Sequence, residues 1–250
     1  MAYLIEQSVR FLIFLSETLG SLGWAIIAFT LLTKFAIFPL ATSSIKAQKQ
    51  LQKLQPELKK LNEKYKNDKQ KLQQAQMELY QKYNANPIAG CVPQLLQLGV
   101  IIILYQAMLA FLGEDIPQGM NLNFFWFNLT QADKTYVLPI LSGLTQLILS
   151  LMIAPGGEVR DLVPNKSKNQ KVKVANEKEE NMAEMAATMQ QQMIFVMPVI
   201  MVVITAQFPS GLALYWVVSN IFTIGQQYFI SGWGGLIVYY QRLVNKYGKN

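Results

Sequence analysis

One basic residue, Lys34, interrupts a run of apolar residues that extends from Leu22 to Leu40. If this run crosses a bilayer, the charge costs about 2.5–3.5 kcal/mol on insertion scales, and such a charge usually faces a cavity or a partner. Lys34 is only six residues from Leu40, or about 9 Å along a helix. Its long stem could therefore carry the ammonium to the membrane surface instead. Two interpretations are therefore compatible with this position: a lysine that snorkels to the membrane surface, and a lysine that faces an aqueous cavity.

Uncharged polar residues at helical spacing occur in other apolar runs. Such side chains normally face protein or water rather than lipid. They could simply join helices, but no carboxylate in any run is available to pair with Lys34. We therefore favour a hydrated groove, in which a cation attracts acidic residues of an incoming polypeptide while its apolar part enters lipid. The candidate substrate-binding residues are Lys34, Thr30, Gln97, Gln146, Trp216, Ser219, Asn220 and Thr223.

The residues needed for bond-making chemistry are missing from the sequence. There is no histidine and only one cysteine, Cys91, which excludes Ser-His and Cys-His arrangements and any disulfide within the chain. No Gly-rich phosphate loop or metal-ligand cluster is recognisable. A Ser-Lys protease centred on Lys34 has no supporting motif. We expect no catalytic residue, cofactor or metal, and hence no enzyme.

The elements that must position these residues are five apolar runs. Hydrophobic residues make up 52% of the chain and charged residues only 15%, against about 25% charged in soluble domains. A bilayer span needs about 20 apolar residues. The predicted spans are 22–40, 92–112, 136–154, 191–208 and 211–230, within a core of residues 21–230.

The basic residues predict the orientation of these spans. Ten lie in loop 41–86, six in loop 155–190 and three after residue 230, out of 22 in total. These segments alternate along the chain, so the positive-inside rule assigns them to the cytoplasm. The N-terminus is then outside and the C-terminus is cytoplasmic. This bias accounts for the net charge of +7 without direct nucleic-acid recognition.

Segment 42–86 is predicted to form a cytoplasmic helical hairpin. Leu51, Leu54, Leu58 and Leu61 follow a 3-4-3 spacing, which predicts one narrow apolar seam. Asn67-Asp68 interrupts the pattern before it resumes, so two antiparallel helices are expected. Pro56 should kink the first of them. The hairpin could be a passive link between spans or a mobile platform for incoming chains.

The remaining segments flank the membrane. Residues 1–20 contain too short an apolar core to span and are predicted to form an interfacial amphipathic helix. Residues 124–127 are four adjacent aromatics, typical of an interfacial belt. Segment 156–183 mixes charge and Asn and is expected to be a partly disordered cytoplasmic loop. Residues 231–250 form a short cytoplasmic tail.

At several of these positions the chain resembles the YidC family of membrane protein insertases, the YidC/Oxa/Alb group, in its bacterial type without the large external domain. The resemblance covers roughly residues 20–230. Each fragment is weak alone, but their order on these spans is specific. The matching stretches are Gly23-Trp24, Phe38-Pro39-Leu40, Leu54-Gln55-Pro56, Asn86-Pro87, Gly90-Cys91, Pro93, Leu138-Pro139-Ile140-Leu141, Met197-Pro198-Val199, Phe208-Pro209-Ser210-Gly211-Leu212, Leu214-Tyr215-Trp216, Ser219-Asn220 and Gln226-Gln227.

The resemblance implies an all-α integral membrane protein with five transmembrane helices around a hydrophilic groove. It implies an insertase and chaperone in the bacterial inner membrane, acting on nascent membrane proteins alone or with the Sec translocon, with the ribosome as a further candidate partner. Lys34 matches an intramembrane Arg of the family, which keeps the charge but loses the bidentate guanidinium. Trp216 and Gln146 match groove positions. A small-solute or ion transporter is the alternative, although five unlike spans argue against internal repeats; a passive scaffold would leave Lys34 unexplained.

Overall fold

The described part of the chain is almost entirely helical. The computed structural model describes residues 2–65, 68–86, 92–110, 121–154 and 182–247. Its elements in chain order are α1 (Ala2–Leu19), α2 (Leu22–Lys64), α3 (Lys69–Lys82), α4 (Val92–Ala110), β1 (Asn123–Phe124), β2 (Phe127–Asn128), α5 (Val137–Ile153), α7 (Met182–Gln207), α8 (Ser210–Ser231) and α9 (Gly235–Tyr247).

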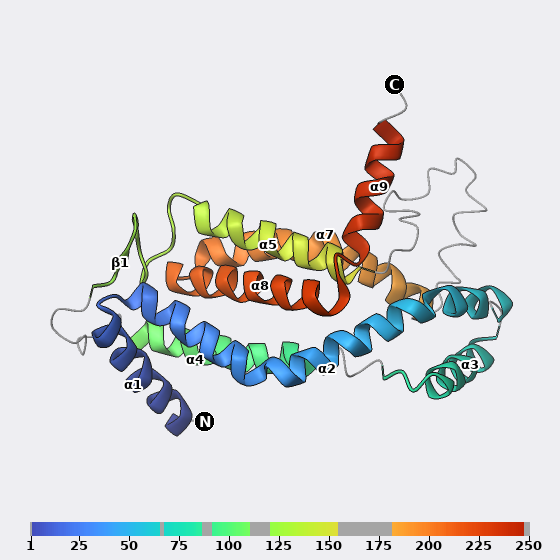
Figure 1. Cartoon of the computed structure of the whole chain (residues 1–250), viewed down its shortest axis with the longest axis horizontal. Coiled ribbons are helices and arrows are strands. Elements are labelled where there is room, and N and C mark those ends of the chain that lie inside the picture. The colour runs from blue at the N-terminus through green and yellow to red at the C-terminus, as the bar shows by residue number, and fades with distance from the viewer. Residues whose placement is uncertain (1, 66–67, 87–91, 111–120, 155–181, 248–250) are drawn as a thin grey trace.

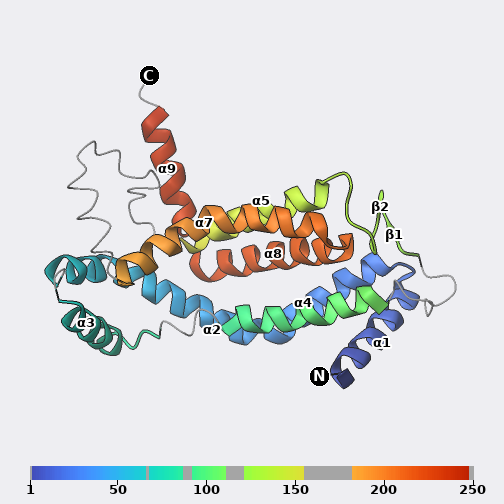
Figure 2. The same cartoon turned by 180° about the vertical axis from the view of Figure 1, so that it is seen from behind.

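Helix α8 is the centre of an elongated bundle (Figure 1). It contacts α2 and α4 on one side and α5 and α7 on the other, and α5 also packs along α7. The reverse view shows α4 beside α2, with α1 lying against both (Figure 2). Polar side chains on α8 can therefore meet two different groups of helices.

A close-packed apolar core occupies the end of the bundle where α1 meets α2. It is built from α1, α2, α4, α8 and the short β1–β2 hairpin, and includes the fully buried Leu12, Ile26 and Met108. At Gly23 a Cβ atom would come within 2.2 Å of the Phe124 ring, so the hairpin rests directly on the first turn of α2. This end of the bundle is filled with side chains.

The turn before α8 is tied to the same end. The Ser210 backbone N–H donates to the Gln131 carbonyl at 2.7 Å, and the Gly211 N–H donates to the Leu129 carbonyl at 2.9 Å. A Cβ atom at Gly211 would lie 2.8 Å from the Met108 sulfur and 3.1 Å from the Leu129 oxygen. The Pro-Ser-Gly sequence at 209–211 therefore joins the loop after β2 to the start of α8.

The start of α5 is capped from this loop. The Asp133 carboxylate accepts hydrogen bonds from the Thr135 N–H at 2.9 Å, the Thr135 hydroxyl at 2.5 Å and the Leu138 N–H at 2.8 Å. Burial raises the pKa of Asp133, but these bonds stabilise the charged form and outweigh it, so its pKa is lowered. The buried carboxylate thus satisfies backbone donors that the first turn of a helix leaves open.

Helix α2 continues without a break from the first predicted span into the predicted hairpin. Both Pro39 and Pro56 lie inside it. The expected boundary near residue 41 marks where the apolar run ends, because the following residues are polar but still favour helix. Hydropathy detects the change of environment and not the end of the helix.

The far half of α2 pairs with α3. Leu54, Leu58 and Leu79 are buried together. Gln76 donates to Asn62 at 3.1 Å and Tyr83 donates to Glu57 at 2.8 Å. The later residue of α3, Tyr83, contacts the earlier residue of α2, Glu57, so the two helices are antiparallel.

Among the described residues, α2 is the one helix long and apolar enough to cross a bilayer, over Leu22–Leu54. Three shorter apolar helical segments follow, Leu96–Leu109, Val137–Ile153 and Ile194–Gln207. The predicted loop 156–183 lies almost wholly outside the described residues, as do residues 111 and 112 of the predicted span 92–112.

Candidate functional site

Lys34 is held by side chains from α4 and α8. Its ammonium donates to the Gln97 side-chain oxygen at 3.2 Å and to the Thr223 hydroxyl at 3.1 Å. The Gln97 side-chain nitrogen donates in turn to the Ser219 hydroxyl at 3.2 Å and to the Tyr215 hydroxyl. We call these five residues (Lys34, Gln97, Tyr215, Ser219 and Thr223) the Lys34 cluster.

The helical repeat of α8 explains why three members of the cluster lie together. Tyr215, Ser219 and Thr223 are spaced four residues apart, so they share one face of the helix. The Thr223 hydroxyl also donates to the Ser219 carbonyl of its own helix at 2.8 Å. The α8 face therefore presents hydroxyl groups that can accept from the lysine and the glutamine.

The charge of Lys34 is not neutralised by a carboxylate within the described part of the chain. The two salt bridges there, Arg10–Glu6 and Lys71–Asp68, are within α1 and at the start of α3. Lys34 is half-buried, and its hydrogen-bond partners Gln97 and Thr223 are uncharged. A cation held by neutral dipoles keeps its long-range attraction for an anion.

A second polar contact lies on the other side of α8. The Asn220 side-chain nitrogen donates to the Thr145 hydroxyl at 3.3 Å and to the Gln146 side-chain oxygen at 3.2 Å, both on α5. Nearer the end of α8, Gln226 donates to the Phe38 carbonyl at 3.2 Å and the Thr42 hydroxyl at 3.1 Å on α2. Polar residues of α8 therefore also join its neighbours.

The eight candidate residues divide into three groups. Four of them belong to the Lys34 cluster: Lys34, Gln97, Ser219 and Thr223. Gln146 and Asn220 form the α5–α8 contact. Thr30 is fully buried and its hydroxyl donates to the Ile26 carbonyl of its own helix at 2.6 Å, whereas Trp216 is half-buried on α8.

Sequence reasoning missed Tyr215 as a site residue. It is almost fully buried and accepts from Gln97. A signal was present, because Tyr215 continues the four-residue spacing of Ser219 and Thr223 by one turn. A tyrosine in an apolar run, however, is usually assigned to packing, since most of its surface is apolar.

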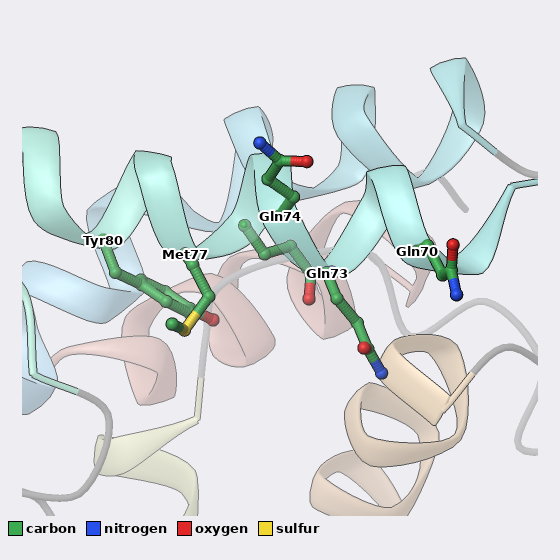
Figure 3. Close-up of a pocket in the computed structure, with 6 residues that line it drawn as sticks. Gln70, Gln73, Gln74, Met77 and Tyr80 are labelled. Carbon is green, nitrogen blue, oxygen red and sulfur yellow. The ribbon is translucent and has the colours of Figure 1, made fainter.

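A separate hollow of about 570 Å³ lies along α3, in the hairpin (Figure 3). Its lining is uncharged and consists of Gln70, Gln73, Gln74, Gln76, Met77 and Tyr80. The part of α2 that packs on α3 begins near Leu54, about 30 Å along the helix from Lys34. We place the candidate site at the Lys34 cluster, because only there does a half-buried cation lie in an apolar segment.

Within the described residues, no group of three or more Cys, Asp or Glu side chains could hold a metal ion. The geometry of the cluster thus offers hydrogen bonding and positive charge. It holds an ammonium between α2, α4 and α8.

Comparison with known proteins identifies the family. The family model described as "60Kd inner membrane protein" matches residues 14–234 of this chain. The chain belongs to this family. It is a membrane-protein family, so the helices described above are those of a protein of the membrane.

Individual relatives agree with this assignment. A Fusobacterium nucleatum protein named "Membrane protein insertase YidC" is 34% identical, with 92% of this chain and 98% of that protein covered. "Membrane protein insertase MisCA" of Bacillus subtilis is 35% identical, with coverages of 84% and 70%. A YidC insertase of Geobacter sulfurreducens is 35% identical over 92% of this chain, but the chain spans only 37% of that protein's length. The relatives are named as insertases rather than as enzymes.

The fold also matches a solved member of the family. The crystal structure described as "Active YidC insertase crystal structure with the first transmembrane domain resolved" aligns with a TM-score of 0.63. The two chains are 21% identical, and the alignment covers 91% of this chain and 46% of the other. The likeness therefore supports the helical fold.

Proposed function

We propose that this chain is a membrane protein insertase, which moves hydrophobic segments of nascent proteins from the cytoplasm into the bilayer. Its relatives carry that name over nearly the whole of this chain. The observation that carries the mechanism is the Lys34 ammonium, held by Gln97 and Thr223 with no carboxylate beside it in the described chain. Insertion requires only that a polypeptide be bound and released, so no covalent bond has to be broken.

The mechanism follows from the cost of desolvation. A polar or acidic flank of a client segment loses several kcal/mol of hydration in hydrocarbon. A hydrated, cationic groove at the Lys34 cluster lowers that cost over part of the bilayer, while the apolar part of the client moves sideways into lipid. The proposed groove residues are the Lys34 cluster together with Gln146, Trp216 and Asn220, whereas the Thr30 hydroxyl is buried and bonded within α2.

The proposed topology has five spans, with the N-terminus outside and the C-terminus in the cytoplasm of a bacterial inner membrane. The distribution of Lys and Arg supports it. The packed core around Leu12, Ile26 and Met108 would then close the outer end, which favours release of clients into lipid over passage through the membrane. A transporter is the less favoured alternative, because transport requires a path across the whole membrane and the packed core would block that path.

Reconstitution tests the function. The purified chain in liposomes should promote insertion of a short, single-span client with a translocated flank, compared with protein-free liposomes and with liposomes holding an unrelated five-span protein. Insertion at the level of those two controls would refute the insertase. Adding purified Sec translocon, or ribosomes carrying the nascent client, then measures whether either partner increases the yield.

Water access at position 34 tests the groove separately. A Lys34→Cys substitution in a Cys91→Ser background should react with a membrane-impermeant thiol reagent added from the cytoplasmic side. A cysteine at Leu32, an exposed apolar residue of the same helix, is the lipid-facing control. If neither position 34 nor position 32 reacts, the hydrated groove is refuted, while the family assignment is unaffected.

A further inference from the structure

Helix α9 leaves the bundle instead of adding to it. It follows α8 after a short turn and runs across the long axis of the bundle in both views (Figures 1 and 2). Its main contacts with the rest of the described chain are with α5. If α2 and α8 cross the bilayer, α9 therefore extends along the membrane surface.

The turn between α8 and α9 is fixed by close packing. Gly232 and Gly234 have positive φ angles of 71° and 51°, which glycine adopts at little cost. A Cβ atom at Gly234 would be 2.2 Å from the Met152 carbonyl oxygen, and one at Gly235 would be 2.4 Å from the Ala154 oxygen. The direction of α9 thus follows from its contact with the end of α5.

The α2 helix supports the same junction. The Lys49 ammonium donates to the Ile230 carbonyl at 3.3 Å, and the Gln52 side chain donates to the Ile153 carbonyl. These are carbonyls in the last turns of α8 and α5, which have no partner within their own helices. The root of α9 is therefore a junction of α2, α5 and α8.

An apolar stripe on α9 is largely exposed. Ile237, Tyr240 and Val244 are 42%, 66% and 47% exposed. Their spacing of three and four residues puts them along one side of the helix. The polar residues of α9 follow at positions 241, 242, 245 and 246, which the helical repeat places mainly on the other side. A short helix divided in this way is typical of one that lies in a lipid interface.

Exposed aromatic side chains surround the root of α9. Phe229 is 87% exposed, and Tyr228 and Trp233 are also exposed. The ring of Tyr228 lies 5.7 Å from that of Phe229 and 4.9 Å from that of Trp233. Trp and Tyr are enriched at the level of lipid headgroups, so these rings mark the depth at which α9 begins.

The positive charge of residues 235–250 favours binding to an anionic lipid surface. Residues 235–250 contain Arg242, Lys246 and Lys249 and no acidic residue. A basic segment at a membrane surface is attracted to anionic lipids. The same charges repel a second copy of α9, which disfavours a helix-to-helix dimer.

We propose that α9 is a lipid-binding anchor, which lies on the cytoplasmic leaflet with Ile237, Tyr240 and Val244 in the headgroup region of anionic lipids. The proposal rests on the membrane topology given above. It gives the α8–α9 junction a fixed position at the membrane surface, beside the point where α2 continues into the hairpin.

Fluorescent labelling of the full chain tests the anchor. Single cysteines at Tyr240 or Val244, in a Cys91→Ser background, carry an environment-sensitive dye in liposomes with about one third phosphatidylglycerol. Asn245→Cys is the matched control, because it lies about 140° around the helix from position 240. The dyes at 240 and 244 should be quenched by shallow spin-labelled lipid and protected several-fold from aqueous iodide, whereas the dye at 245 should not.

Three results would overturn or redirect the proposal. Equal iodide quenching of the dyes at 240, 244 and 245 would show that α9 is surrounded by water, which contradicts the anchor. Equal protection in phosphatidylcholine alone would remove the role of anionic lipid. Protection that disappears when each liposome holds one chain would indicate a second copy as the partner.

The orientation and the function are measured on the same samples. An Asn250→Cys variant labelled by an impermeant reagent reports the side of the C-terminus, so an inverted topology is distinguished from a free α9. Insertion of the test client reports the insertase activity independently. A Tyr240→Glu, Val244→Glu variant should expose a dye placed at position 237 to iodide. Asn245→Glu, which lies about 140° around the helix from position 240, is the control and should leave that dye protected.

Discussion

Gln97 connects the Lys34 ammonium to the hydroxyl groups of α8. Its oxygen accepts from Lys34 at 3.2 Å while its nitrogen donates to Ser219 at 3.2 Å and to Tyr215. Both ends of one amide are thus used, which fixes the amide orientation and leaves the positive charge of Lys34 uncompensated. Substitutions of Lys34 can therefore test the charge of the site, and substitutions of Gln97 can test its geometry.

Replacing Lys34 tests the charge. Attraction between unit charges in a partly hydrated site is worth about 1–4 kcal/mol, so Lys34→Ala should reduce insertion of clients with acidic translocated flanks by about tenfold or more. Lys34→Arg should keep most of the activity. The measurement is the rate of insertion in proteoliposomes for matched clients with acidic and neutral flanks. Full activity of the alanine variant on the acidic client would contradict the charge mechanism.

Replacing Gln97 tests the geometry. Gln97→Leu leaves polar atoms of Tyr215 and Ser219 without this partner, and we expect a loss of about 1–3 kcal/mol in the free energy of unfolding. Gln97→Glu adds an anion beside Lys34 and should lower insertion of acidic clients while keeping stability closer to wild type. Thermal unfolding and the insertion rate, measured on both variants, separate the two effects. If Gln97→Glu inserts acidic clients at the wild-type rate, Lys34 does not act through its charge.

A glycine in α5 tests the packing of the bundle. A Cβ atom at Gly143 would lie 2.3 Å from a methyl group of Val202 on α7 and 3.1 Å from the Pro198 oxygen. Gly143→Ala should therefore cost about 1–3 kcal/mol of stability. Gly225→Ala is the control on α8, where nothing lies within 4 Å of the added atom, and it should be neutral or slightly stabilising. Equal unfolding temperatures of the two variants would argue against the close α5–α7 contact.

The Asp133 cap predicts a change of stability with pH. Because the pKa of Asp133 is lowered in the folded chain, its contribution is complete above the unfolded pKa of about 3.9. The contribution is lost as the pH falls through the folded pKa. Asp133→Asn should cost about 1–3 kcal/mol near neutral pH, and its difference from wild type should shrink on going from about pH 6 to about pH 3.

Unfolding in detergent across that pH range provides the measurement. Glu63→Gln, which replaces an exposed carboxylate of α2, serves as the control and should follow wild type throughout. A difference between Asp133→Asn and wild type that stays constant with pH would mean that the carboxylate does not carry the cap.

The sequence alone determined the kinds of environment along the chain. Hydropathy depends on local composition, so the apolar runs, the cation inside the first of them and the Lys-rich segments were visible without coordinates. The leucine spacing of the hairpin and the helical spacing of polar residues in the apolar runs were visible for the same reason, because a helix repeats every 3.6 residues. These patterns also carried the family resemblance.

Only the tertiary structure decided which polar residues meet. Lys34, Gln97 and Thr223 are far apart in sequence, and their contact depends on how α2, α4 and α8 are rotated about their axes. The same rotation turned Asn220 toward α5 and left the Thr30 hydroxyl bonded within its own helix. The direction of α9 likewise follows from the contact of Gly234 with Met152. Such choices depend on side-chain packing between distant segments, which periodicity along one helix does not contain.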